Sequence, residues 1–224
     1  MKKYYFTSES VTEGHPDKLC DTISDNILDK CMEQDDNARV AVETFASNNK
    51  ISLAGQITLK KGKVNYEKIV RDTIREIGYG DKEIDIDPET CEIDINITEQ
   101  SNDIAMGVDV GGAGDQGIMF GYASDETDDY MPYAISMAHR LAKRLTEVRK
   151  KKIIPYLRPD GKTQVTVEYE DDKPKRIETV LISTQHEATA EQSQLKQDII
   201  EKVIKPTIPN NMIDENTKVY VNPT

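Results

Sequence analysis

The sequence lacks a long apolar run, and it has few cysteines. No stretch approaches the ~18 consecutive apolar residues of a membrane-spanning helix, so no span is predicted. The N-terminal segment begins like a signal peptide, but it turns polar at Thr7, so its apolar part is too short for that role. The three cysteines form no CxxC pair, which disfavours a disulfide framework or a zinc site and favours core packing. We therefore expect a cytoplasmic protein whose cysteines, Cys20, Cys31 and Cys91, are structural.

Positive charge is also scarce. The 224 residues include 29 Lys and Arg against 41 Asp and Glu, a formal net charge of −12. Nonspecific binding to nucleic acid requires an excess of basic residues to neutralise phosphates, so that class of partner is disfavoured. A phosphate-bearing substrate would need a local cationic pocket. The length allows one large or two small globular domains.

The apolar pattern predicts a mixture of helices and strands. Helical spacing predicts helices over 17–34, 65–77, 132–149 and 190–204. Alternation and aromatic content predict strands over 4–8, 39–46, 51–59, 93–97, 118–122, 164–170, 176–184 and 217–222. Both halves then read β-α-β-β-α-β, an α+β fold in which the pattern repeats although the sequences are not visibly alike. The predicted division is an N-terminal unit over 1–100, a glycine-rich loop over 101–117 and a central unit over 118–224.

The run Gly14-His15-Pro16-Asp17-Lys18 precedes the first predicted helix. Free N–H groups and the dipole at a helix N-terminus attract anions. His15 and Lys18 add positive charge, and Asp17 is a ligand type that Mg²⁺ prefers. The alternative is that Pro16 begins the helix and the polar residues only cap it. The segment from Gln100 to Gly117 is rich in glycine, and its pattern alone fits either a lid over a ligand or a flexible connector.

Two strands carry polar residues of interest. Glu43 shares a face with Ala41 and Phe45, so it either binds a partner or cation or reaches solvent from an edge strand. On the strand at 51–59, Gln56 points to the face opposite Ile57.

Several segments together resemble the S-adenosylmethionine synthetases (methionine adenosyltransferases). They are Phe6 to Lys18, Gly112 to Gly117 with Gly121-Tyr122-Ala123, Leu157 to Val165, Ser183-Thr184-Gln185-His186 and Val221-Asn222-Pro223-Thr224. The resemblance runs in the family's order along the chain. It implies a fold of three similar α+β units, of which this sequence holds two and lacks the C-terminal one.

The resemblance also implies a reaction. The sulfur of L-methionine attacks C5′ of ATP and displaces tripolyphosphate, which is then hydrolysed to pyrophosphate and phosphate. Such a displacement needs alignment and cations on the phosphates rather than a strong base. By the same resemblance His15 and Lys162 are catalytic, and the ATP-binding residues are His15, Asp115, Asp160, Gly161 and Lys162. Gln56 and Gln100 contact methionine, Asp17 binds Mg²⁺ and Glu43 binds K⁺. Without the resemblance, Lys162 in a predicted turn is a solvated lysine and Asp115 is a turn residue.

Three departures from the family pattern bear on function. Gln56 stands where the family usually has a glutamate that pairs with the methionine ammonium, which predicts weaker methionine binding. The loop from Gly107 to Gly112 is shorter than in many members. The C-terminal third, which carries further phosphate-binding residues, is not in this sequence.

Three functions therefore compete. The first is S-adenosylmethionine synthesis by a homodimer or homotetramer with shared active sites, without nucleic-acid or membrane partners. The second is a catalytically incomplete piece of the same fold that binds nucleotide or a sister subunit. The third is another Mg²⁺-dependent enzyme, such as a tripolyphosphatase, which Gln56 slightly favours.

Overall fold

The computed structural model describes residues 2–80, 86–99 and 117–223. The chain forms two compact units, each with its own hydrophobic core. One unit comprises Pro16–Gly121, and the other comprises Met1–His15 together with Tyr122–Thr224. Among the described residues, no helix combines the length and the apolar character needed to cross a membrane.

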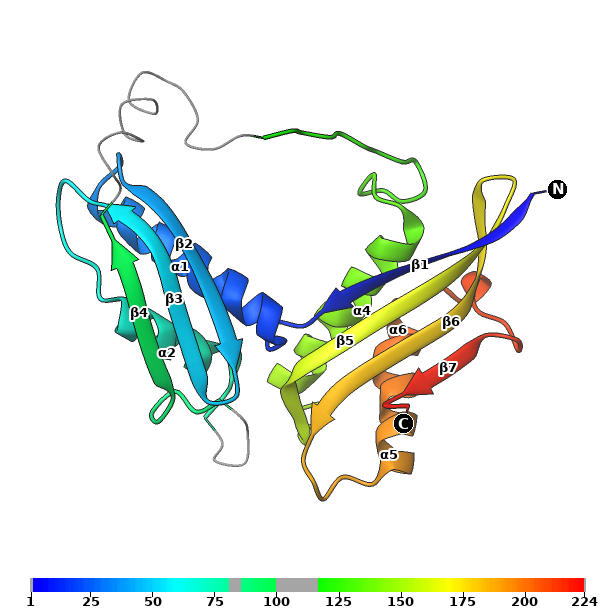
Figure 1. The fold of residues 1–224 in the computed structure, drawn as a ribbon. Coiled ribbons are helices and arrows are strands. Elements are labelled where there is room, and N and C mark those ends of the chain that lie inside the picture. Colours follow the sequence, from blue (N-terminus) through cyan, green and yellow to red (C-terminus); the bar gives the residue numbers. More distant parts are fainter. Residues whose placement is uncertain (1, 81–85, 100–116, 224) are drawn as a thin grey trace. The chain divides into compact units, whose positions relative to one another are not determined.

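The unit Pro16–Gly121 is a sheet covered on one face by two helices (Figure 1). Its elements are α1 (Pro16–Gln34), β2 (Arg39–Ser47), β3 (Lys50–Thr58), α2 (Tyr66–Ile77) and β4 (Glu92–Thr98). β2 and β3 are antiparallel, and β3 and β4 are parallel, in the order β2-β3-β4. Leu19, Ile23 and Ile27 of α1 are fully buried, which confirms the apolar stripe predicted for this helix. Gly78 ends α2 in the left-handed conformation with φ 105°, as the sequence predicts.

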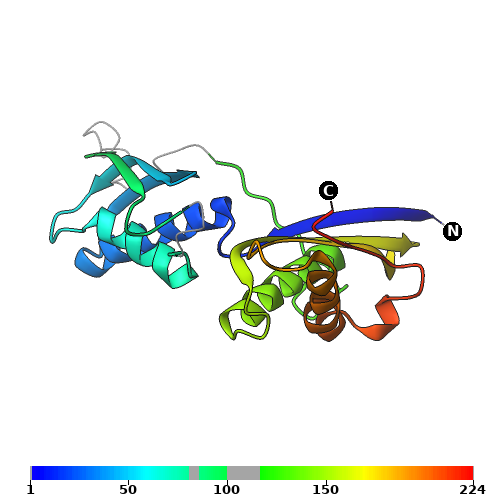
Figure 2. The ribbon, with the colours of Figure 1, turned by 90° about the horizontal axis from the view of Figure 1, so that it is seen from below.

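The other unit repeats this connectivity, and its helices also lie on one face of the sheet (Figure 2). Its elements are β1 (Lys3–Val11), α4 (Tyr133–Lys150), β5 (Leu157–Glu170), β6 (Lys173–His186), α5 (Gln192–Ile199), the π-helical segment η1 (Ile200–Ile204), α6 (Lys205–Thr207), the short 3₁₀ segment η2 (Asn210–Met212) and β7 (Lys218–Val221). The sheet order is β1-β5-β6-β7. Asp171 and Asp172 both have positive φ, the conformation of a two-residue hairpin turn between β5 and β6.

The prediction of two equivalent β-α-β-β-α-β halves needs two corrections. The first strand of the chain, β1, pairs antiparallel with β5, from Lys3 opposite Glu170 to Val11 opposite Lys162. The strand predicted over 118–122 is wrong, because this segment is irregular and Phe120 is 88% exposed. Strand propensity measures how well a side chain packs on a sheet, and these residues pair with no described strand.

The helix predicted over 190–204 contains an irregularity with a local cause. Pro206 has no N–H group, so the carbonyl of Lys202 lacks the donor it would have in an α-helix. The Arg144 side chain of α4 supplies one instead, with Nε 2.9 Å from the Lys202 oxygen. The preceding turn, Ile200–Ile204, is π-helical.

Candidate functional site

The candidate site is built on a bulge in β5. Leu157 pairs with His186 and Gly161 with Thr184, so residues 158–160 lie opposite Gln185 alone. Pro159 is accommodated here because a bulged residue needs no N–H for the ladder. Asp160, Gly161 and Lys162 are therefore strand residues at and beside a bulge, and the predicted turn and the predicted strand start at 164 are wrong.

The end of β1 fastens this bulge. The Thr12 backbone N–H donates to the Gly161 carbonyl at 2.9 Å, and the Thr12 hydroxyl donates to the Pro159 carbonyl at 2.8 Å. Gly14 lies so close that a Cβ atom there would be 2.4 Å from the carbonyl carbon of Pro159. A glycine is required at this point because the two backbones are in contact. Thr12, for which no role was predicted, is buried.

Four of the predicted residues line one cavity of about 530 Å³. His15 enters it from the end of β1, and Asp160, Gly161 and Lys162 enter it from β5. The remaining lining residues are Ser183, Thr184, Gln185, Asn222 and Pro223. Burial raises the pKa of Asp160, although His15 and the Gly161 backbone act in the opposite direction. The cavity thus combines an imidazole and an ammonium group, which suit an anionic ligand, with a carboxyl group whose pKa is raised above its ordinary value.

Lys162 is held by a residue that sequence reasoning missed. Its Nζ atom lies 2.8 Å from Oε2 of Glu9, and the two side chains are 41% and 48% exposed. Glu9 pairs with Gln164 across β1 and β5, which puts Glu9 and Lys162 on the same face. A phosphate bound by Lys162 must therefore compete with the Glu9 carboxylate. Glu9 is visible in the segment Phe6 to Lys18, but its partner depends on the register of β1.

Glu13 is a second missed residue. Its carboxylate accepts hydrogen bonds from Arg149 Nη2 at 2.5 Å and from Lys150 Nζ at 2.8 Å. Both cations lie at the end of α4, where the sequence showed only a basic cluster. These two ion pairs hold the segment between Thr12 and His15 against α4, the helix that packs on this sheet.

The other predicted residues that the structure describes, Asp17, Glu43 and Gln56, are not among those that line this cavity. Asp17, in the first turn of α1, belongs to the compact unit that begins at Pro16. Glu43 is exposed on β2, opposite Ala54, and Gln56 lies on the same face, opposite Ala41. Because β2 is an edge of its sheet, Glu43 has the geometry of a glutamate that reaches solvent. Gln100 and Asp115 lie outside the described residues, as does the glycine-rich loop up to residue 116.

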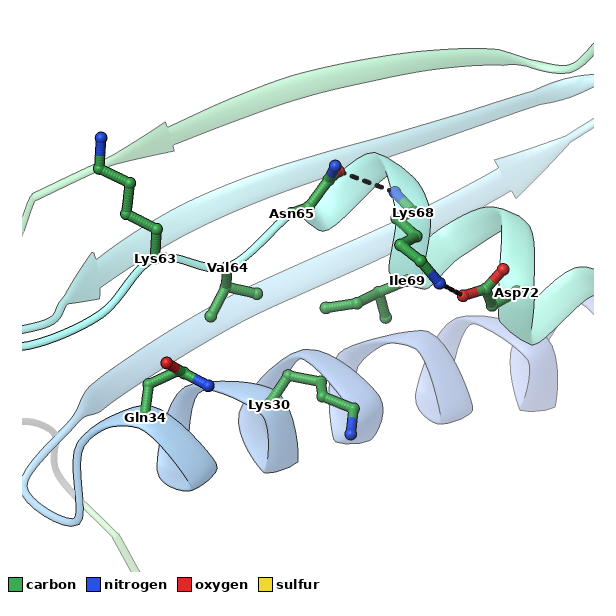
Figure 3. A pocket seen from close by; sticks show the side chains of 8 residues that line it. All are labelled: Lys30, Gln34, Lys63, Val64, Asn65, Lys68, Ile69 and Asp72. Carbon is green, nitrogen blue, oxygen red and sulfur yellow. Dashed lines mark hydrogen bonds and ion pairs between the residues drawn. The ribbon is translucent and has the colours of Figure 1, made fainter.

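A second cavity, of about 260 Å³, lies between α1 and α2 (Figure 3). Lys30, Lys63 and Lys68 line it, but Lys30 pairs with Glu33 at 2.6 Å and Lys68 pairs with Asp72. The Asn65 side chain caps α2 by accepting from the Lys68 N–H. None of the predicted site residues within the described ranges lines this cavity, so it is not the candidate site. Within the described ranges, no group of three or more His, Cys, Asp or Glu side chains is placed to surround a metal ion.

Comparisons with known proteins cover nearly the whole chain. Residues 3–102 match the family model described as S-adenosylmethionine synthetase, N-terminal domain, and residues 110–224 match the model of the central domain. The chain is 55% identical over 237 aligned residues to the S-adenosylmethionine synthase of Brachyspira hyodysenteriae, covering 100% of this chain and 60% of that protein. It is 53% identical to the synthase of Clostridium tetani, covering 98% of this chain and 59% of that protein. The chain thus spans about 60% of the length of these curated relatives. The matches to both domain models, over segments that include the bulge and its partners, place the chain in the S-adenosylmethionine synthetase family.

Proposed function

We propose that this chain supplies the N-terminal and central parts of a methionine adenosyltransferase. In the proposed reaction a sulfur lone pair of L-methionine forms the bond to C5′ of ATP as the C5′–O bond breaks. Tripolyphosphate leaves, and water then cleaves it to pyrophosphate and phosphate. The observation that carries the proposal is the cavity in which His15, Asp160, Gly161 and Lys162 converge. Family membership supports it.

The residues of the cavity suit a charged leaving group. His15 and Lys162 would place positive charge on the phosphates as the C5′–O bond breaks. Gly161 is required by packing behind the cavity wall, because a Cβ there would lie 2.9 Å from Cδ2 of the buried Leu145 of α4. Asp115 would complete the ATP site, and Gln56 and Gln100 would contact methionine. No group in this set needs to act as a strong base, since the sulfur nucleophile is neutral.

Mg²⁺ and K⁺ are the proposed cofactors. Mg²⁺ is usually held in proteins by one or two carboxylates, with substrate phosphates and water as its other ligands. A single exposed carboxylate such as Asp17, two residues beyond His15, fits that donor set. When bound, the ion would neutralise phosphate charge. Glu43 would be the K⁺ ligand, and its exposed carboxylate leaves room for further oxygen ligands.

The proposed assembly is a cytoplasmic homodimer or homotetramer with shared active sites and no nucleic-acid or membrane partner. Residues 1–100 and 118–224 are proposed as two of the family's repeated units, with 101–117 as the gating loop between them. Because β1 lies in the sheet of β5, β6 and β7, the first of these sequence units contributes a strand to the sheet of the second.

A second candidate is a catalytically incomplete module of the same fold that binds nucleotide or a sister subunit. The observation that favours it is coverage, since the chain spans about 60% of its relatives. A tripolyphosphatase without alkyl transfer is a third candidate, which the uncharged Gln56 favours.

Three measurements on the same chain separate these candidates: formation of S-adenosylmethionine, binding of nucleotide, and release of phosphate from tripolyphosphate. The 224-residue chain is incubated with ATP, L-methionine, Mg²⁺ and K⁺, and S-adenosylmethionine is measured by mass spectrometry. Product formation supports the transferase. Nucleotide binding without product identifies the incomplete module. Phosphate release from tripolyphosphate that does not depend on methionine, without the sulfonium product, identifies the third candidate.

A further inference from the structure

The carboxyl end of β7 has an unusual connection to β6. The parallel ladder between these strands ends at Ile182 and Val221. The next residue, Asn222, donates its backbone N–H to the Ile182 carbonyl at 2.9 Å and then turns the chain with φ 43°. Asparagine tolerates this left-handed conformation better than most residues with a side chain. The backbone therefore leaves the sheet beside Thr184 without pairing with it.

The Asn222 side chain takes the place of the missing strand. Its Oδ1 accepts the Thr184 N–H at 2.7 Å, and its Nδ2 donates to the Thr184 carbonyl at 2.9 Å. Only one orientation of the amide satisfies both bonds, because one partner is a donor and the other an acceptor. Thr184 is 6% exposed, so its peptide groups need such partners. Gln192 of α5 also holds this end of β7, with Nε2 3.1 Å from the Val221 carbonyl oxygen.

Thr184, whose peptide groups Asn222 binds, lies between Ser183 and Gln185, two residues that line the candidate cavity. Ser183 is the cross-strand partner of Lys162, and Gln185 lies opposite the bulge that carries Asp160. Strand alternation puts both side chains on the face of Lys162. The Gln185 Oε1 atom is buried without a hydrogen-bond partner among the residues that the structure describes. Any rotation of the Thr184 peptide would move this wall relative to Lys162.

We propose that Asn222 is a positioning residue for phosphate binding. Its amide fixes the Thr184 peptide and thereby sets the distance between the Ser183–Gln185 wall and the Lys162 ammonium. The inference rests on the proposed function, because the triphosphate of ATP is the ligand that this wall would meet. It adds a residue that touches no reacting atom to the four that line the cavity from β1 and β5.

Two substitutions distinguish the effect of the Asn222 side-chain amide from the effect of its backbone conformation. Asn222→Gly keeps the positive φ without strain but removes both side-chain bonds. Asn222→Asp keeps the acceptor for the Thr184 N–H but places an oxygen against the Thr184 carbonyl. Asn211→Asp controls for the change in net charge, since Asn211 is exposed in the same unit. Asn222 itself lines the cavity, so the uncharged Asn222→Gly is the variant that tests the positioning role without adding charge there.

The probe is inorganic tripolyphosphate with Mg²⁺, titrated calorimetrically into the 224-residue chain, alongside amide hydrogen exchange at Thr184. We expect both Asn222 variants to bind about tenfold more weakly, on the scale of one lost hydrogen bond to a charged group. Asn211→Asp should bind like the parent. Faster exchange at Thr184 is expected in Asn222→Gly alone, a split that general destabilisation would not produce.

The outcomes are distinguishable. If the parent chain binds tripolyphosphate and both Asn222 variants bind it equally well, the positioning role is wrong and the proposed function stands. If the parent shows a protected Thr184 amide but binds no tripolyphosphate, the proposed function fails for this chain, and the positioning role fails with it.

Discussion

The two compact units share a connectivity but differ at one sheet edge. In one unit the order is α1-β2-β3-α2-β4, and in the other it is α4-β5-β6-α5-β7. Each has an antiparallel pair followed by a parallel strand that is reached through a helix. β2 is an edge strand, whereas the equivalent edge of β5 is covered by β1. The extra strand β1 makes a site possible in this sheet, because the segment that follows it places Thr12, Gly14 and His15 beside the bulge in β5.

A repeated fold therefore need not repeat a site. In the sheet of β2-β3-β4 the polar residues Glu43 and Gln56 lie on an exposed face. In the other sheet comparable residues are organised by contacts between segments more than a hundred positions apart, such as Val11 with Lys162. The cavity therefore depends on a long-range pairing, and breaking that pairing should abolish it.

The largest effects are expected from glycines at strand contacts in each unit. A Cβ at Gly14 would lie 2.4 Å from Pro159, and a Cβ at Gly55 would lie 2.0 Å from the Ala41 carbonyl oxygen. Since both clashes are with backbone atoms, we expect Gly14→Ala and Gly55→Ala each to lower the free energy of unfolding by about 3 kcal/mol. Urea unfolding measures the loss, and hydrogen exchange assigns it to the unit that carries the substitution.

Gly121→Ala is the control for both variants. Among the described residues, leaving out its two chain neighbours, no atom lies within 4 Å of a Cβ built at Gly121, so the expected change is within about 0.5 kcal/mol. Parental stability of Gly14→Ala would contradict the close contact between the end of β1 and the bulge.

The next effect concerns catalysis at the cavity. Lys162→Met should slow sulfonium formation about 10²-fold, the scale of losing one preorganised electrostatic contact. Lys218→Met is matched to it, because Lys218 also lies in this sheet and pairs with a glutamate, Glu178, at 2.6 Å, but does not line the cavity. The kcat of each variant is measured by mass spectrometry of the product. A Lys162→Met variant with the parental kcat would remove Lys162 from the catalytic set.

Local pattern was enough to predict most elements but not the geometry of the site. The stripe through Leu19, Ile23 and Ile27 predicts α1 because burial follows the helical period. Pro159 and Gly161 predict a turn by the same local rules, yet they lie in β5. Their backbone groups are satisfied by Thr12, about 150 positions earlier, and no local rule contains that partner.

A smaller effect is expected on the exposed face of the other unit. Gln56→Glu would give the methionine ammonium a charged hydrogen-bond acceptor. Because a hydrogen bond to a charged group is roughly twice as strong as a neutral one, we expect KM for methionine to fall about fivefold. Glu43 lies diagonally across β2 and β3 on the same face, and its charge limits the gain. Gln34→Glu, on α1, is the charge-matched control. An unchanged KM in Gln56→Glu would show that Gln56 does not meet methionine.

The smallest effects, opposite in sign, come from one carboxyl group in each unit, the half-buried Asp160 and the buried Asp35. Burial raises the pKa of Asp160, whereas hydrogen bonds from the Lys60 and Asn37 backbones lower the pKa of Asp35. A raised native pKa means that the folded state binds more protons than the unfolded state between the two pKa values, so stability falls as pH rises through that window. A lowered native pKa has the reverse effect, and its contribution is lost as pH falls through that value.

Asp160→Asn should therefore be more stable than the parent at neutral pH, with a difference that shrinks on acidification. Asp35→Asn should be less stable at neutral pH, and its deficit should shrink as the pH falls, because the parent loses the stabilisation of its ionised Asp35. Urea unfolding between pH 3 and pH 8 compares the slopes, with hydrogen exchange again separating the units. Slopes of the same sign would contradict these two pKa shifts, the one raised by burial at Asp160 and the one lowered by hydrogen bonds at Asp35. Slopes of opposite sign would mean that the cavity keeps a desolvated carboxyl group, Asp160, at a cost in folding stability. Such a cost is expected where a site is organised to bind a ligand rather than to stabilise the fold.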